Sequence, residues 1–346
     1  MTRLTRILIG AGFILAIQSA RAQITGAMQQ ADTAEERRQR EQTAQSYAAG
    51  ESAPELYDGE SSDVGPQSVL KLKPRKTWFE AMADAQYFYT DNMFLTEHNK
   101  QAADVLVSTA QFALAPTPYP LADGTFAPRL GYRHQWFDFG LAKPGPEISV
   151  LDFQTHTIRP GHLDDFDFNA QTVFADGRWS RNHWIIEGGF DFTRLMTTAD
   201  YLEFYKEYVP RIGVQRLLPV TDRTAFSLGY TGDYRFTDAP TFFRAFDRDF
   251  DDRTDHAFSA SLTQVLCAHA ILQPYYQFKY THFTHSSVGT RNDYLNSVGL
   301  ALYCIVCPNF EIRGYFDYSR RNSDNSAVAA YRQLDAGGGV NVTFKF

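Results

Sequence analysis

The last fifteen residues of the chain read RQLDAGGGVNVTFKF, from Arg332 to Phe346. One set of alternate positions is apolar or small: Leu334, Ala336, Gly338, Val340, Val342, Phe344 and Phe346. The other set is polar or glycine: Asp335, Gly337, Gly339, Asn341, Thr343 and Lys345. Because successive side chains of a strand point to opposite faces, this stretch predicts a strand with one apolar and one polar face. Each strand of a transmembrane β-barrel needs that pattern, because it meets lipid on one side and a wet lumen on the other.

The same period of two recurs from Lys76 onward, with Phe310, Ile312 and Phe316 alternating with polar residues in one example. In the segment 165–177, we expect Phe166, Phe168, Ala170 and Phe174 on one face and Asp167, Asn169, Gln171 and Val173 on the other. The predicted strands are 77–90, 104–115, 125–138, 165–177, 182–194, 205–217, 223–236, 254–266, 270–283, 293–305, 308–320 and 332–346. Each is near the length that a tilted membrane strand needs. The sequence therefore predicts an all-β protein, an antiparallel transmembrane β-barrel of about 12 strands.

The lengths of the connectors support this strand count. Bacterial barrels keep both termini in the periplasm, with short turns there and long loops outside. The predicted inside turns are 116–124, 178–181, 218–222, 267–269 and 306–307. The predicted outside loops are 91–103, 139–164, 195–204, 237–253, 284–292 and 321–331. All the inside turns except 116–124 are shorter than every outside loop.

The N-terminus has the pattern of a secretory signal peptide, residues 1–22. Arg3 and Arg6 precede an apolar run from Ile7 to Ile17, and Ala20-Arg21-Ala22 supplies small residues for cleavage before Gln23. The apolar run is too short to cross a ~30 Å hydrocarbon core as a helix. Residues 23–75 lack an apolar period, which predicts a short periplasmic tail, partly disordered or helical. A plug or a partner-docking arm is the alternative for this tail, and residues 76–346 form the barrel.

Composition agrees with a membrane barrel. Aromatic residues make up 15% of the chain, with 28 Phe and 19 Tyr, while the mean hydropathy is only -0.36. Removal of residues 1–22 leaves 30 basic and 40 acidic residues. This acidic balance argues against a nucleic-acid partner, which usually needs a basic stripe.

Charged residues of both signs fall on the predicted polar face, where they would line the lumen. The candidates are Arg129, Arg133, Glu187, Asp191, Arg211, Asp233, Arg235, Lys279, Glu311, Arg313 and Asp317. Interleaved charges can line an aqueous pore or pair with one another and close it. A barrel of this size lies between filled barrels of eight strands and open porins, so the sequence leaves both readings open.

Cys267, Cys304 and Cys307 all fall near the predicted periplasmic rim. Because the periplasm is oxidising, we expect one disulfide, either Cys267–Cys307 or Cys304–Cys307. A redox or zinc role fits less well, because the chain has no second cysteine pair at zinc spacing.

We expect no enzyme, cofactor or metal site. His285-Ser286-Ser287 is the one local Ser–His candidate for a surface hydrolase, and the chain has no Gly-x-Ser-x-Gly elbow. Asp247, Asp249, Asp251 and Asp252 resemble the start of a calcium loop, but its glycine and closing glutamate are missing. A solvated external loop explains these aspartates better.

Two short stretches are similar to a known family. They are Thr90-Asp91-Asn92-Met93-Phe94-Leu95-Thr96 and Tyr318-Ser319-Arg320-Arg321-Asn322-Ser323-Asp324. They resemble segments of the outer-membrane β-barrel porins that Gram-negative bacteria often encode in exopolysaccharide gene clusters. The likeness extends loosely over 76–346. It implies a channel or export role, without a ligand or functional residues.

The sequence thus predicts a porin-like channel in the outer membrane of a Gram-negative bacterium, for passive passage of small hydrophilic solutes or export of polysaccharide. A non-conducting structural or partner-binding barrel is the alternative. We expect outer-membrane lipid, lipopolysaccharide and the barrel-insertion machinery as partners, the last through Val342, Phe344 and Phe346, and a periplasmic partner through residues 23–75.

Overall fold

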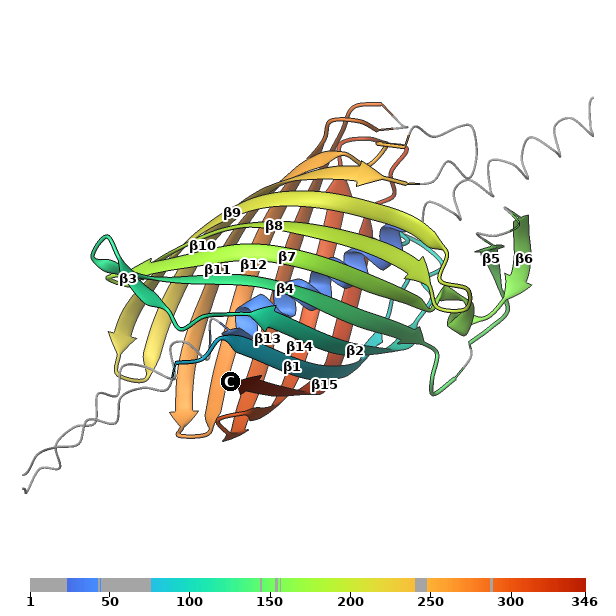
Figure 1. Cartoon of the computed structure of the whole chain (residues 1–346). Coiled ribbons are helices and arrows are strands. Elements are labelled where there is room, and N and C mark those ends of the chain that lie inside the picture. Colours follow the sequence, from blue (N-terminus) through green and yellow to red (C-terminus); the bar gives the residue numbers. More distant parts are fainter. Residues whose placement is uncertain are drawn as a thin grey trace, which may run out of the picture.

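The computed structural model describes residues 24–42, 44, 76–143, 145–152, 155, 157–239, 248–286 and 289–346. Its main feature is a closed antiparallel barrel of 12 strands (Figure 1). Its strands are β1 (Phe79–Thr90), β2 (Ala103–Leu114), β4 (Gly124–Phe139), β7 (Phe168–Arg181), β8 (Trp184–Thr197), β9 (Glu203–Thr221), β10 (Thr224–Asp238), β11 (Arg253–Cys267), β12 (Ala270–Phe283), β13 (Arg291–Cys307), β14 (Phe310–Ser323) and β15 (Tyr331–Lys345). Each pairs with its neighbours along the chain, and pairing of β1 with β15 closes the barrel.

The predicted fold and strand count are confirmed, and the strand ends differ by at most four residues. The largest differences are at β7 and β9, which end at Arg181 and Thr221 instead of at 177 and 217. Both strands keep pairing down to tight turns. The β7–β8 turn is made by Asn182 and His183, whose positive φ angles of 46° and 67° suit a two-residue hairpin.

Short connectors gather at one end of the barrel and long ones at the other. The turn 115–123 is the longest of the short set and contains β3 (Tyr119–Leu121), which pairs with β4. On the opposite end, the β4–β7 loop carries the hairpin β5 (Ile148–Asp152) and β6 (Thr157–Gly161) and the 3-10 helix η1 (Leu163–Phe166). We call the end with the long loops the outer end, because long loops of bacterial barrels face outside.

The outer surface of the barrel is apolar along its middle. Leu228, Phe258, Val298, Phe316 and Phe344 are all exposed there. A continuous apolar surface of this size must be covered, and the closed barrel leaves no unpaired strand edge in lipid. The barrel is therefore a transmembrane barrel of the Gram-negative outer membrane. Among the described residues, no helix is both long and apolar enough to cross a membrane.

The structure corrects the orientation of β7. Phe168 and Phe174 point inward and are 2% and 3% exposed, whereas Val173 faces lipid and is 47% exposed. The register explains this, because Phe168 pairs with Phe137 and their rings stack 4.3 Å apart inside the barrel. Apolar residues occupy both alternate sets of this strand, so periodicity alone does not decide its faces.

Residues 24–42 form a helix that runs through the lumen of the barrel (Figure 1); we call it the inner helix. Its charged side chains contact inward-facing residues of the wall. The expectation of a periplasmic tail is thus corrected for these residues, and the plug alternative describes them better. The physical reason is that the helix carries acidic and basic groups that pair with charged residues of the barrel wall. The predicted signal peptide, residues 1–22, and residues 45–75 of the predicted tail lie outside the described residues.

Candidate channel lumen and its inner helix

Acidic residues of the inner helix bind basic residues of the barrel wall. Asp32 Oδ1 lies 2.7 Å from Arg235 Nη1, and Asp32 Oδ2 lies 3.9 Å from Arg253 Nη2. Glu36 Oε1 lies 2.9 Å from the ammonium nitrogen of Lys279. These partners stand on the neighbouring strands β10, β11 and β12. Arg235 and Arg253 also pair with wall carboxylates, such as that of Asp255, so the acids of the helix join a network of mixed charge on these strands.

Two further acids of the helix extend this contact. Glu35 Oε2 lies 2.9 Å from Arg133 Nη1 on β4 and also pairs with Arg38 on the next turn. Glu41 Oε2 lies 2.7 Å from Arg313 Nη1 on β14. Ion pairs thus join the helix to several parts of the wall rather than to a single strand.

Arg37 makes the reverse contact, a helix cation on an acidic wall. Its Nε donates to Asp317 at 2.8 Å and its Nη2 donates to Asp335 at 2.7 Å. The guanidinium also lies over the rings of Phe88 and Tyr315, at 4.6 and 4.3 Å from their centroids. Two carboxylates and two aromatic faces around one buried guanidinium form the most completely matched contact of the helix.

The contacts fix the direction of the inner helix. Asp32 binds Arg235 and Arg253, which lie near the outer ends of β10 and β11. Glu41 binds Arg313, three residues from the start of β14 at the opposite end. The helix therefore runs from the outer mouth toward the periplasmic end, and its 19 residues span about 28 Å, close to the thickness of a bilayer core.

The first turn of the helix closes the outer mouth with apolar side chains. Ile24, Ala27 and Met28 are buried in one cluster with Met93 and Phe166. These partners belong to the β1–β2 loop and to η1, so the outer loops fold over the end of the helix.

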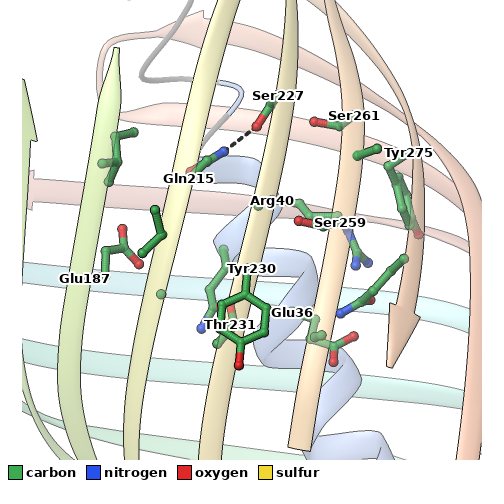
Figure 2. A pocket seen from close by; sticks show the side chains of 18 of the residues that line it. Glu36, Arg40, Glu187, Gln215, Ser227, Tyr230, Thr231, Ser259, Ser261 and Tyr275 are labelled. Carbon is green, nitrogen blue, oxygen red and sulfur yellow. Dashed lines mark hydrogen bonds between the residues drawn. The ribbon is translucent and has the colours of Figure 1, made fainter. Parts of the chain in front are cut away.

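Two polar cavities remain between the inner helix and the barrel wall. One has a volume of about 130 Å³ and lies beside Glu36 and Arg40 (Figure 2). Its wall side chains are hydroxyls and amides for the most part, including Gln215, Ser227 and Ser259. The second, of about 120 Å³, lies beside Asp32 and Glu35. Both share Glu36 and Gln39 in their linings, so they follow one side of the helix.

The lumen candidates fall into two groups in the structure. Five contact the inner helix: Arg133, Arg235, Lys279, Arg313 and Asp317. Five others pair with charges of the wall: Arg129 with Asp176, Arg211 with Asp176 and Asp191, Glu187 with Arg178, and Asp233 with Arg235. Glu311 is buried. All 11 candidates lie on the inward-facing set of their strands.

Sequence reasoning missed several charges that complete these clusters. They are Asp84, Glu207, Arg253, Asp255 and Asp335, and the charged residues of the inner helix. Asp84 and Asp335 occupy alternate positions in strands whose apolar residues already showed a period of two. The run of acidic and basic residues from Asp32 to Glu41 was the signal in the sequence that could have indicated the inner helix. A helix that is polar on all sides needs charged partners to be stable.

The predicted disulfide is not formed, because Cys267, Cys304 and Cys307 are all free. The register puts Ala270 of β12 between Cys267 of β11 and Cys304 of β13, and Cys307 lies three residues further along β13, so Cys267 and Cys307 also stand on strands separated by a third. That separation is about 9–10 Å, beyond the Cα distance that a disulfide allows. Cys304 and Cys307 lie on one extended strand, β13, where three residues also span about 10 Å.

The two terminal aromatic residues of the predicted insertion signal face the lipid. Phe344 and Phe346 are exposed on the outer surface, and the backbone of Phe346 pairs with Phe79 at the barrel seam. Val342 is half-buried on the same strand. Their recognition by the insertion machinery stays a prediction.

The acidic outer loop uses two of its aspartates in the fold. Asp251 pairs with Arg253 at 2.5 Å, and Asp252 accepts hydrogen bonds from the backbone and hydroxyl of Thr237. Ligand atoms of Asp249, Asp252 and His285 lie within 4.8 Å of one another. Asp247 lies outside the described residues. The carboxyl groups of Asp251 and Asp252 thus bind other residues of the loop and its flanking strands. These contacts explain the two aspartates as part of the fold.

Comparison with known proteins gives structural likeness only. No protein-family model and no curated protein matches the chain. An outer-membrane channel from Pseudomonas putida F1 is 9% identical with a TM-score of 0.48, covering 78% of this chain and 96% of that one. The β domain of the Bordetella autotransporter BrkA is 11% identical with a TM-score of 0.46, covering 78% and 100%. The porin KdgM, in complex with disordered oligogalacturonate, is 13% identical with a TM-score of 0.37, covering 76% and 99%.

Proposed function

We propose that the protein is a porin-like outer-membrane channel whose lumen is closed by the inner helix and opens when that helix moves. The observation that carries this proposal is the polar contact between helix and wall. The helix is held by ion pairs along its length. Its buried apolar side chains are few and mostly small: Ile24, Ala27, Met28, Ala34 and Ala44. The desolvation cost of buried ion pairs offsets much of their attraction, so such a helix can be released more readily than one packed by an apolar core.

Small hydrophilic solutes are the class that the lumen fits best. The cavity beside Glu36 offers hydroxyl and amide groups from Gln215, Ser227 and Ser259, with charges of both signs nearby. Such a lining exchanges hydrogen bonds with a hydrated neutral solute and has no single-sign field to select an ion. Export of a polysaccharide uses the same chemistry and is the second form of this proposal.

The test is single-channel conductance of the refolded protein in a planar bilayer, with and without residues 24–42. We expect short, infrequent openings from the full chain and long-lived open steps from the deletion variant, because only the latter has an unobstructed lumen. Resistance of the barrel to SDS before heating shows that both forms are folded. If the folded, inserted deletion variant carries no current, the channel proposal is wrong.

A non-conducting barrel that binds a periplasmic partner is the alternative. It predicts that removal of residues 24–42 changes capture of a periplasmic protein and leaves the current at zero.

Surface hydrolysis is a third reading and centres on His285, whose Nδ1 lies 3.8 Å from carboxylate oxygens of Asp249 and Asp252. Loss of hydrolysis of lipid or peptide substrates in His285→Ala and Ser286→Ala variants would support it.

A further inference from the structure

Two arginines stand side by side on the outer surface of the barrel. Arg320 of β14 and Arg332 of β15 are direct cross-strand partners, and both are exposed. Arg320 shares its strand face with Phe316, and Arg332 shares its face with Val340, both of which face lipid. The two guanidinium groups therefore project from the outer surface and not into the lumen.

The pair lies at the upper edge of the apolar belt. Arg320 is three residues before the end of β14 at Ser323, and Arg332 is the second residue of β15. Directly beneath them the register places Tyr318 opposite Leu334, and then Phe316 opposite Ala336. An aromatic residue followed by cations marks the level at which hydrocarbon gives way to lipid headgroups. Since this is the outer end of the barrel, the headgroups belong to the outer leaflet.

Three other cations near the outer end of the barrel have acidic partners. Lys206 lies 3.1 Å from Asp238, Arg248 lies 2.6 Å from the same carboxyl group, and Lys100 lies 2.7 Å from Asp91. In the part of the chain that the structure describes, no ion pair of this kind involves Arg320 or Arg332. The other cross-strand neighbour of Arg320 is Asn296, a neutral side chain that accepts a hydrogen bond from Tyr276 at 2.7 Å.

Like charges directly opposite each other destabilise a sheet, because their Cβ atoms are only about 4.5–5.5 Å apart. An anion between the two guanidinium groups removes that repulsion and receives charge-assisted hydrogen bonds from both. Guanidinium groups suit phosphate in particular, because their planar donors match its oxygens in pairs.

We propose that Arg320 and Arg332 bind a phosphate group of a phosphorylated outer-leaflet lipid, the lipid A part of lipopolysaccharide. The acyl chains of that lipid lie along the apolar surface of β14 and β15, where Ile312, Phe316 and Val340 are exposed. This position meets both requirements of such a lipid. The two arginines face its phosphate group, and the apolar wall below them faces its acyl chains. This site is separate from the lumen and does not depend on channel activity.

The test is binding of purified lipid A to the full chain in detergent, followed by native mass spectrometry or by a fluorescent lipid A analogue. The variant is Arg320→Gln/Arg332→Gln. The matched control is Arg216→Gln/Arg223→Gln, which removes the same charge from exposed residues near the periplasmic end. We expect the Arg320/Arg332 variant to bind lipid A about tenfold more weakly or worse, and the control to bind like the wild type.

A second readout separates binding from folding. Without lipid, Arg332→Gln alone should raise the temperature at which the barrel unfolds, because it removes a like-charge contact. With lipid A, the wild type should gain more thermal stability than this variant. Equal lipid A affinity of the wild type and the Arg320/Arg332 variant would overturn the proposal. Equally tight binding of dephosphorylated lipid A would overturn it too, because the phosphate is then not the group recognised. Competition by free inorganic phosphate at equal concentration would show that a soluble anion, not the lipid, is the ligand.

Discussion

At the scale of single residues, Arg37 is the position on which the docking of the inner helix depends most. Its guanidinium neutralises Asp317 and Asp335 together, and both carboxyl groups belong to buried residues. Removing one partner of a buried ion pair leaves charge that neither water nor protein compensates. Such a loss costs about 3–5 kcal/mol.

We therefore expect Arg37→Gln to release the helix and raise the open probability of the channel by at least about tenfold. The measurement is single-channel recording. Arg40→Gln is the control, because Arg40 is on the same helix and lies over the ring of Tyr275 at 4.0 Å, where the structure gives it no acidic partner among the described residues. The second substitution Asp317→Asn in the Arg37→Gln background should restore part of the closed state, because it removes one of the two uncompensated charges. An unchanged open probability in Arg37→Gln would contradict the role of this contact.

Asp167 is the residue at which pH should act on the outer loops. It lies between η1 and β7, where its Oδ1 accepts a hydrogen bond from the backbone of Phe139 at 2.8 Å. Burial, with added repulsion from neighbouring aspartates, raises its pKa from 3.8 to about 7, although the bond from Phe139 opposes that shift. A raised pKa in the folded state means that folding favours the protonated form.

The loop contact at Asp167 should therefore be most stable below about pH 4 and lose stability as the pH rises through 7. Hydrogen exchange of the β4–β7 loop, corrected for the intrinsic pH dependence, measures this directly. Beyond that correction, exchange in the wild type should accelerate as the pH rises from about 4 to about 7 and change little above that, and Asp167→Asn should show no such step. A step of equal size in the variant would assign the effect to another group.

At the scale of elements, the inner helix and the strands obey different rules. A strand of the wall needs only alternation and pairing with its neighbours, and both can be read locally. The helix buries charged groups on several sides, as Glu35, Arg37 and Glu41 show. It therefore depends on the surrounding barrel for its stability, because most of the stability of a helix in a protein comes from its tertiary contacts.

The direction of the helix predicts which of its ends can be reached from outside the cell. A cysteine at Thr25 should react with a membrane-impermeant maleimide on intact cells, and a cysteine at Gln42 should not, because Gln42 is at the periplasmic end. Ser326→Cys in the exposed β14–β15 loop is the positive control. Cys267, Cys304 and Cys307 lie at the periplasmic end and serve as an internal negative control. Labelling at position 42 without labelling at position 25 would show that the helix runs in the opposite direction.

At the scale of the whole molecule, the barrel combines two surfaces with opposite requirements. The outside is apolar along its middle and carries cations at its outer rim, as a bilayer with an anionic outer surface requires. The inside carries charges of both signs and holds a helix with the complementary charges. The formal net charge of -7 is thus divided among many local pairs, so it says little about what passes through the lumen.

The sequence by itself determined the barrel, the strand count and the ends of most strands. The reason is that alternation is a local property, and lipid outside with water inside imposes it on each strand separately. It failed in β7, where Phe168 and Val173 stand in opposite sets and only pairing with β4 decides which set faces the lumen. It also placed the 11 candidate charges on the strands, without showing what they bind.

Only the tertiary structure decided what fills the lumen. Asp32 and Arg235 are 203 positions apart and Arg37 and Asp335 are 298 apart, so no local pattern could join them. The three cysteines show the opposite case. They lie near one rim of the barrel, and two of them are close in the chain, but the strands hold them too far apart to form a disulfide. Alternation determines which side of the wall a residue faces, and closure of the barrel determines which residues meet across it.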